Sequence, residues 1–138
     1  HAATNGPKQI LNTYKIGNKF YKQERLCSRK QIDLLFQKNK SSVAFPLKAV
    51  HIETATELLF PAQVMFVVPK RNFKKAHDRN TIRRRMREAY RLAKNSFYDK
   101  LKLQNKKLLV ALIYTGKKEE NYAVIETAVL KVLNSITR

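Results

Sequence analysis

The sequence predicts an α+β fold, with helices packed on a four-stranded sheet in the order α-β-β-β-α-β-α. Four runs have the length and the β-branched or apolar composition of strands. Three other segments repeat apolar residues at the period of a helix with one buried side. With 138 residues, 43% of them hydrophobic, the chain is large enough to build one core.

The N-terminal residues 1–19 are polar and aperiodic, so we expect a flexible arm there and a single domain over residues 20–138. The arm lacks the apolar segment of a signal peptide, and no apolar run is long enough to span a membrane. A single cysteine, Cys27, suits a reducing compartment. We therefore expect a cytoplasmic protein.

The first helix is expected from Ser28, as its N-cap, to about Lys38. Three strands follow. They are expected at Ser41–Ala44, at Leu47–Glu53, and at Ala62–Val68 as a central strand that Pro69 ends.

The second helix is basic, and Asp78 is its expected N-cap. Its apolar stripe consists of Ile82, Met86, Ala89, Tyr90, Ala93 and Phe97. The continuous apolar run Leu108–Tyr114 is typical of a strand buried on both faces. A last helix is expected from about Asn121.

The net charge of +19 is far more than solubility requires and predicts a polyanionic partner. Between Lys70 and Lys94 there are eleven basic residues and two acids. At helical spacing, one row beside the apolar stripe contains Asn80, Arg83, Arg84, Arg87, Arg91 and Lys94, whereas Arg85 points elsewhere. A solvated face would explain an ordinary run of charge, but like charges side by side repel each other and arginine suits phosphate oxygens. We therefore expect a phosphate-binding face.

No catalytic constellation is visible in the sequence. The ten acids are scattered, without a pair placed for acid-base chemistry or for two metal ions. One cysteine and three dispersed histidines do not form a zinc site. We expect no catalytic residue, no metal site and no tightly bound cofactor in the protein.

The segment Val68-Pro69-Lys70-Arg71, followed by Arg79-Asn80-Thr81-Ile82-Arg83-Arg84 and Arg87-Glu88-Ala89-Tyr90-Arg91, resembles the bacterial ribonuclease P protein component. That family has a Val-Ser-Lys-Lys type strand end, a short loop, and an Arg-Asn-Arg-x-Lys-Arg helix that continues as Arg-Glu-Ala-Phe-Arg. The chain departs from this pattern at Thr81, where the family usually has arginine. The similarity extends more weakly from about Phe20 to the C-terminus.

The resemblance implies a protein subunit that binds the catalytic RNA subunit of ribonuclease P and the 5′ leader of precursor tRNA. It promotes endonucleolytic 5′ maturation of tRNA, while the RNA performs the cleavage with Mg²⁺ held mainly by RNA. The resemblance also implies an unusual left-handed crossover around the basic helix. We predict no protein partner and no membrane contact.

The predicted contacts to the RNA subunit are Lys70, Arg71, Lys74, Lys75, Arg79, Asn80, Arg83, Arg84, Arg87 and Arg91. The resemblance places a leader cleft at Phe36, Lys48, Val50, Phe66 and Val68. For Phe36 a core position is the alternative, and Val50 stands where the family can carry an aromatic residue. A ribosomal protein that binds folded RNA is the alternative function, and the scattered acids argue against a self-sufficient nuclease.

Overall fold

The computed structural model describes residues 19–138, and the expected arm of residues 1–19 lies outside them except for Lys19. The described elements come in the predicted order, preceded by a short 3₁₀ helix. They are η1 (Lys22–Glu24), α2 (Arg29–Gln37), β1 (Lys40–Ala44), β2 (Leu47–Glu53), β3 (Ala62–Val67), α3 (Ala76–Leu103), β4 (Leu108–Tyr114) and α4 (Tyr122–Ile136). Ser28 is the N-cap of α2, as predicted. Asn121, near which the last helix was expected to begin, is the N-cap of α4.

The four strands form one mixed sheet in the order β1-β2-β4-β3. The pairs β1–β2 and β2–β4 are antiparallel, whereas β3 and β4 are parallel and joined through α3. The α+β class is therefore confirmed, and the basic helix connects the two parallel strands. The expectation that β3 is central was wrong, because β4 occupies that position. The outer edge of β3 is partly covered by the segment after η1, where Leu26 N–H donates to the Val64 carbonyl at 3.0 Å.

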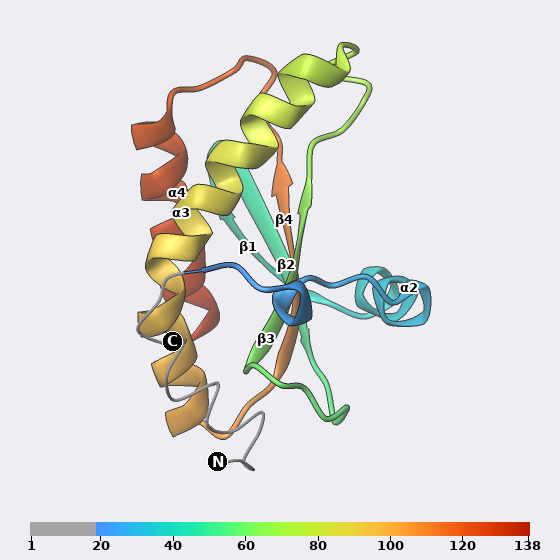
Figure 1. The fold of residues 1–138 in the computed structure, drawn as a ribbon, viewed down its shortest axis with the longest axis vertical. Coiled ribbons are helices and arrows are strands. Elements are labelled where there is room, and N and C mark those ends of the chain that lie inside the picture. Colours follow the sequence, from blue (N-terminus) through green and yellow to red (C-terminus); the bar gives the residue numbers. More distant parts are fainter. Residues whose placement is uncertain (1–18) are drawn as a thin grey trace.

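Helices cover both faces of the sheet (Figure 1). The long α3 and α4 lie side by side on one face, and the short α2 lies on the other. The main core lies under α3 and α4, and a smaller cluster around Leu35, Val50, Leu109 and Ala111 lies under α2. Because β4 is central and covered on both sides, nearly every residue of it is buried, which explains its continuous apolar sequence.

The segment from Lys19 to Glu24 crosses α3 before the chain reaches the sheet (Figure 1). Phe20 packs edge-on against both Phe66 and Tyr90, and Tyr21 stacks on Phe60 with 5.9 Å between ring centroids. These contacts, worth about 0.5–1.5 kcal/mol per aromatic pair beyond the buried area, fix the segment on the helix. Within residues 19–138, no helix is long and apolar enough to cross a membrane.

Candidate RNA-binding surface

The basic helix begins three residues earlier than predicted. Lys75, rather than Asp78, occupies the N-cap position, and it makes no side-chain cap. The guanidinium of Arg79 instead holds the preceding loop against the first turn, because its Nη1 donates to the carbonyls of Phe73 at 2.7 Å and Lys74 at 3.0 Å. Asp78 lies within the first turn, where a negative charge favours the helix dipole. Arg79 therefore shapes the loop, in addition to any contact it makes with RNA.

We call Asn80, Arg83, Arg84, Arg87 and Arg91 the arginine surface. Arg84 and Arg87 are exposed, and neither forms a hydrogen bond or ion pair with another residue of the described part of the chain. Arg83 Nη1 donates to Asn80 Oδ1 at 2.8 Å, which orients its guanidinium along the helix. Two cations without a partner on one face are free to bind phosphate oxygens without first breaking a contact.

Arg91 differs from these residues because it is paired with Glu88. The Nη2 atom lies 2.5 Å from Glu88 Oε2, and the carboxylate remains 45% exposed. This hydrogen bond lowers the pKa of Glu88 and raises the pKa of Arg91. Arg91 therefore stays charged, but it must share its donors between Glu88 and any phosphate.

Four further cations surround the start of α3. Lys70, Arg71, Lys74 and Lys75 are all exposed in the loop that joins β3 to the helix. The ring of Phe73 anchors this loop in the core, where it packs edge-on against Tyr114 at 5.7 Å between centroids. The loop therefore adds exposed positive charge at a defined position beside the arginine surface.

The arginine surface ends where the N-terminal segment crosses the helix. Lys94 belongs to the predicted basic row but is only 1% exposed, so its assignment to an RNA-facing row was wrong. Its Nζ lies 2.8 Å from both carboxylate oxygens of Glu24 and also donates to the Lys19 carbonyl. Tyr98 Oη donates to Glu24 at 2.7 Å. Periodicity alone missed this cluster, because Glu24 lies seventy residues before Lys94 and only the tertiary fold brings them together.

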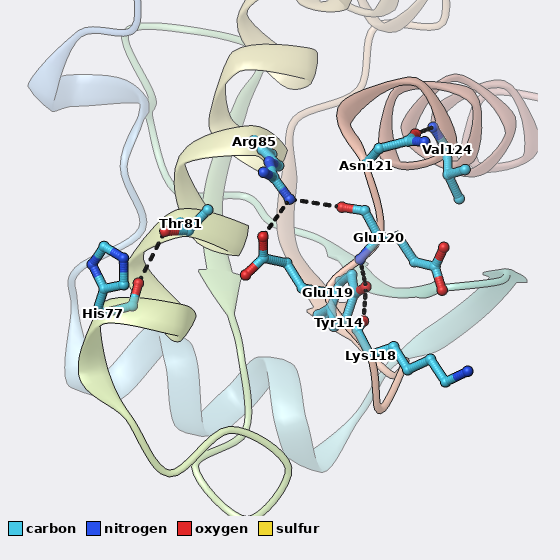
Figure 2. A network of polar contacts seen from close by, with 9 residues as sticks. All are labelled: His77, Thr81, Arg85, Tyr114, Lys118, Glu119, Glu120, Asn121 and Val124. Carbon is cyan, nitrogen blue, oxygen red and sulfur yellow. Dashed lines mark hydrogen bonds and ion pairs between the residues drawn. The ribbon is translucent and has the colours of Figure 1, made fainter.

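Arg85 projects away from the arginine surface, as its helical position predicts. Figure 2 shows its guanidinium directed at the loop between β4 and α4, where it lies 3.0 Å from Glu119 Oε2 and 2.9 Å from the Glu120 carbonyl. Tyr114 Oη shapes the same loop by donating to the Lys118 carbonyl and accepting from the Glu120 N–H. Arg85 thus fastens this loop to α3.

The predicted leader cleft is divided between the two faces of the sheet. Phe36, which is 45% exposed, and Lys48 lie on the α2 side, and Val50 is buried on the same side at 4% exposure. The exposure of Phe36 excludes the core alternative. Phe66 and Val68 belong to the opposite core under α3 and α4, so the prediction that they share a cleft with Phe36 was wrong.

On β3, Met65 rather than Phe66 lies on the α2 side, where it packs on the small cluster beneath that helix. A signal for this assignment was present in the sequence. Gln63 is the polar residue of an otherwise apolar strand, and it marks the more open face. Met65 has the same parity as Gln63, because side chains alternate along a strand.

The described residues contain no group of three or more His, Cys, Asp and Glu side chains placed to hold a metal ion. The buried carboxylate among them, Glu24, is fully hydrogen-bonded to Lys94, Tyr98 and the Tyr21 N–H. The described part of α3 therefore presents exposed cations, without a carboxylate cluster beside them.

Comparison with known proteins agrees with the motif. The sequence matches the ribonuclease P family over residues 20–137. It is 30% identical over 112 residues to the ribonuclease P protein component of Porphyromonas gingivalis, covering 81% of this chain and 82% of the relative.

The fold resembles solved ribonuclease P proteins. The protein from Thermotoga maritima aligns with a TM-score of 0.64 at 20% identity, over 81% of this chain and 96% of that chain. A Staphylococcus aureus ribonuclease P protein mutant with defective mRNA degradation activity aligns at 0.65 and 16% identity, over 96% of this chain and 97% of that chain. The family match decides against the ribosomal alternative: the chain belongs to the ribonuclease P protein family.

Proposed function

We propose that this chain is the protein subunit of a ribonuclease P ribonucleoprotein that removes the 5′ leader from precursor tRNA. Its arginine surface and the loop cations Lys70, Arg71, Lys74 and Lys75 bind the catalytic RNA subunit. The observation that carries this proposal is the exposed, unpaired state of Arg84 and Arg87 on the helix that bears the family motif. Arg85 on the same helix differs, because it is paired with Glu119.

The 5′ leader is assigned to the α2 face of the sheet. Phe36 presents an exposed ring, and Lys48 adds a cation on the same side. A ring that stacks on an unpaired base contributes about 1–3 kcal/mol without sequence preference, which suits a leader of variable sequence. Val50 supports this surface from below rather than contacting the leader.

The cleavage chemistry is assigned to the RNA subunit. Mg²⁺ would be bound mainly by RNA phosphates, and the protein would lower the Mg²⁺ requirement by neutralising neighbouring phosphates. This division of labour fits a protein surface rich in cations and without a positioned acid-base pair.

The test is reconstitution with a bacterial ribonuclease P RNA and a precursor tRNA at low Mg²⁺. We expect neither the RNA-free protein nor the RNA alone to cleave efficiently, and the mixture to cut at the 5′ end of the mature tRNA. A variant with Arg84→Gln and Arg87→Gln should need more protein to reach the same rate. Metal-dependent cleavage by RNA-free protein, or no gain on mixing, would refute the proposal.

A further inference from the structure

A pocket of about 470 Å³ opens near the C-terminal end of α3, away from the arginine surface. It is formed by parts of the chain that are distant in sequence. Lys38 and Lys40 border it from the end of α2 and the start of β1, His51 from β2, and Lys106 from the connection between α3 and β4. Leu108 and Ile136 form an apolar part of the wall.

The charge around the pocket is positive. The three lysines are exposed, and Lys40 lies directly opposite His51 in the register of β1 and β2. The acid among the lining residues is Glu53, which lies 3.9 Å from Lys106 with both side chains about half exposed. A pair this open is weak and leaves Lys106 available to a stronger anion.

His51 gives the pocket an unsatisfied polar group. Its Nδ1 is out of contact with solvent and has no hydrogen-bond partner among residues 19–138. Burial, together with the nearby charges of Lys40 and Lys106, holds the pKa of His51 below its usual value. An anion bound among these lysines would offset the repulsion between the lysine charges and a second proton on the His51 ring. The protonated imidazole would then donate a hydrogen bond to that anion.

The end of α4 at Ile136 does not strongly oppose an anion, although helix C-termini carry partial negative charge. The last carbonyls are already hydrogen-bonded. Thr137 donates to the Leu133 carbonyl, and Gln104 Nε2 donates to the Thr137 carbonyl at 2.6 Å. Such caps satisfy the groups that would otherwise repel a phosphate.

We propose that this pocket binds a phosphate group of RNA, with its lysines holding the phosphate oxygens and Leu108 and Ile136 contacting the attached nucleoside. The inference rests on the proposed function only for the source of the phosphate. Asn80 and Arg91 lie 23 and 12 residues before the end of α3 at Leu103. At 1.5 Å per residue, this end of the helix is about 35 Å from the start of the arginine surface and about 18 Å from its last residue. The bound phosphate therefore lies beyond the arginine surface and is contacted by different side chains.

The phosphate chemistry is tested on the free protein by NMR titration of the imidazole signals, with His51 assigned from the signal lost in His51→Asn. The probes are the dinucleotide uridylyl-uridine, inorganic phosphate and uridine. We expect the first two to shift the His51 signal and raise its pKa, and uridine alone to have no such effect. Lys40→Gln should weaken both responses, whereas Lys102→Gln, an exposed lysine outside the pocket, should not. An unchanged His51 pKa with both anions would overturn the proposal.

The RNA source is tested by the salt dependence of affinity for ribonuclease P RNA. The double variant Lys40→Gln, Lys106→Gln should reduce the slope of log affinity against log salt by about 0.7 for each lost contact, and Lys102→Gln should not. If the double variant has the same slope as the wild type, the pocket binds free phosphate rather than a phosphate of this RNA, and the proposed RNA source is wrong. Failure of the wild-type protein to bind this RNA would count against the proposed function, while the NMR titration would still decide whether the pocket binds phosphate.

Discussion

Replacing Glu24 by glutamine should show how much the contact between the N-terminal segment and α3 contributes to the free energy of unfolding. The substitution keeps the shape of the side chain but leaves the Lys94 ammonium buried without its counter-charge. The side chains of Glu24 and Lys94 are 0% and 2% exposed, so water does not screen the unpaired ammonium charge. Breaking a buried pair by removing one partner costs about 3–5 kcal/mol, a large fraction of the 5–15 kcal/mol typical of a domain.

The structure also predicts how the stability of the Glu24→Gln variant changes with pH. Burial already lowers the pKa of Lys94, and the hydrogen bond that its ammonium donates to Glu24 opposes that shift. Without Glu24 the folded-state pKa falls further below that of the unfolded chain. The unfolded protein then binds more protons, so the stability of Glu24→Gln should rise as pH increases toward the usual lysine pKa of about 10.4.

Urea unfolding followed by circular dichroism measures these effects. We expect Glu24→Gln and Lys94→Met each to lower the unfolding free energy by about 3–5 kcal/mol, and the double variant to lose less than the sum. Hydrogen exchange should show earlier opening of Phe20 and Tyr21. If both single variants unfold within about 1 kcal/mol of wild type, a range usual for exposed pairs, the reasoning about a buried pair is refuted.

Three further predictions concern the RNA-facing residues. Phe36→Ala should weaken binding of precursor tRNA by about 1–3 kcal/mol relative to mature tRNA, with little change in thermal stability. An equal loss of affinity for both tRNAs would contradict a leader contact. Thr81→Arg removes the hydrogen bond to the His77 carbonyl and introduces the arginine usual in the family. The change should tighten binding to the RNA subunit or leave it unchanged, and clear weakening in a folded variant would show that the motif is misaligned. Arg85→Gln should cost at most about 1 kcal/mol of stability in urea unfolding and leave the salt dependence of RNA binding intact; a shallower slope would place Arg85 on the RNA.

The sequence predicted the elements well because local signals agreed with one another. The capping residues Ser28 and Asn121 mark true helix starts, and Leu108–Tyr114 is the doubly covered strand that its apolar run predicts. The start of α3 was misplaced because Arg79 closes the loop in place of a side-chain cap. That interaction has no local sequence signature.

The site was predictable only in part, because helical periodicity gives the faces of a helix but not what covers them. Arg84 and Arg87 are exposed, whereas Lys94 shares their row and is buried by a segment seventy residues away in sequence. Likewise, alternation along β3 places Met65 and Phe66 on opposite faces, and only the single polar residue Gln63 indicates which of the two lies on the α2 side.

The central claim, that the arginine surface binds phosphates of the ribonuclease P RNA, is tested most directly by a salt titration of affinity. The comparison uses wild type, Arg87→Gln, and the control Lys131→Gln, which removes an exposed cation from α4. We expect log affinity to fall linearly with log salt, Arg87→Gln to lower the slope by about 0.7–0.9, and Lys131→Gln to leave the slope unchanged. Equal slopes in all three proteins would show that this surface does not contact the RNA.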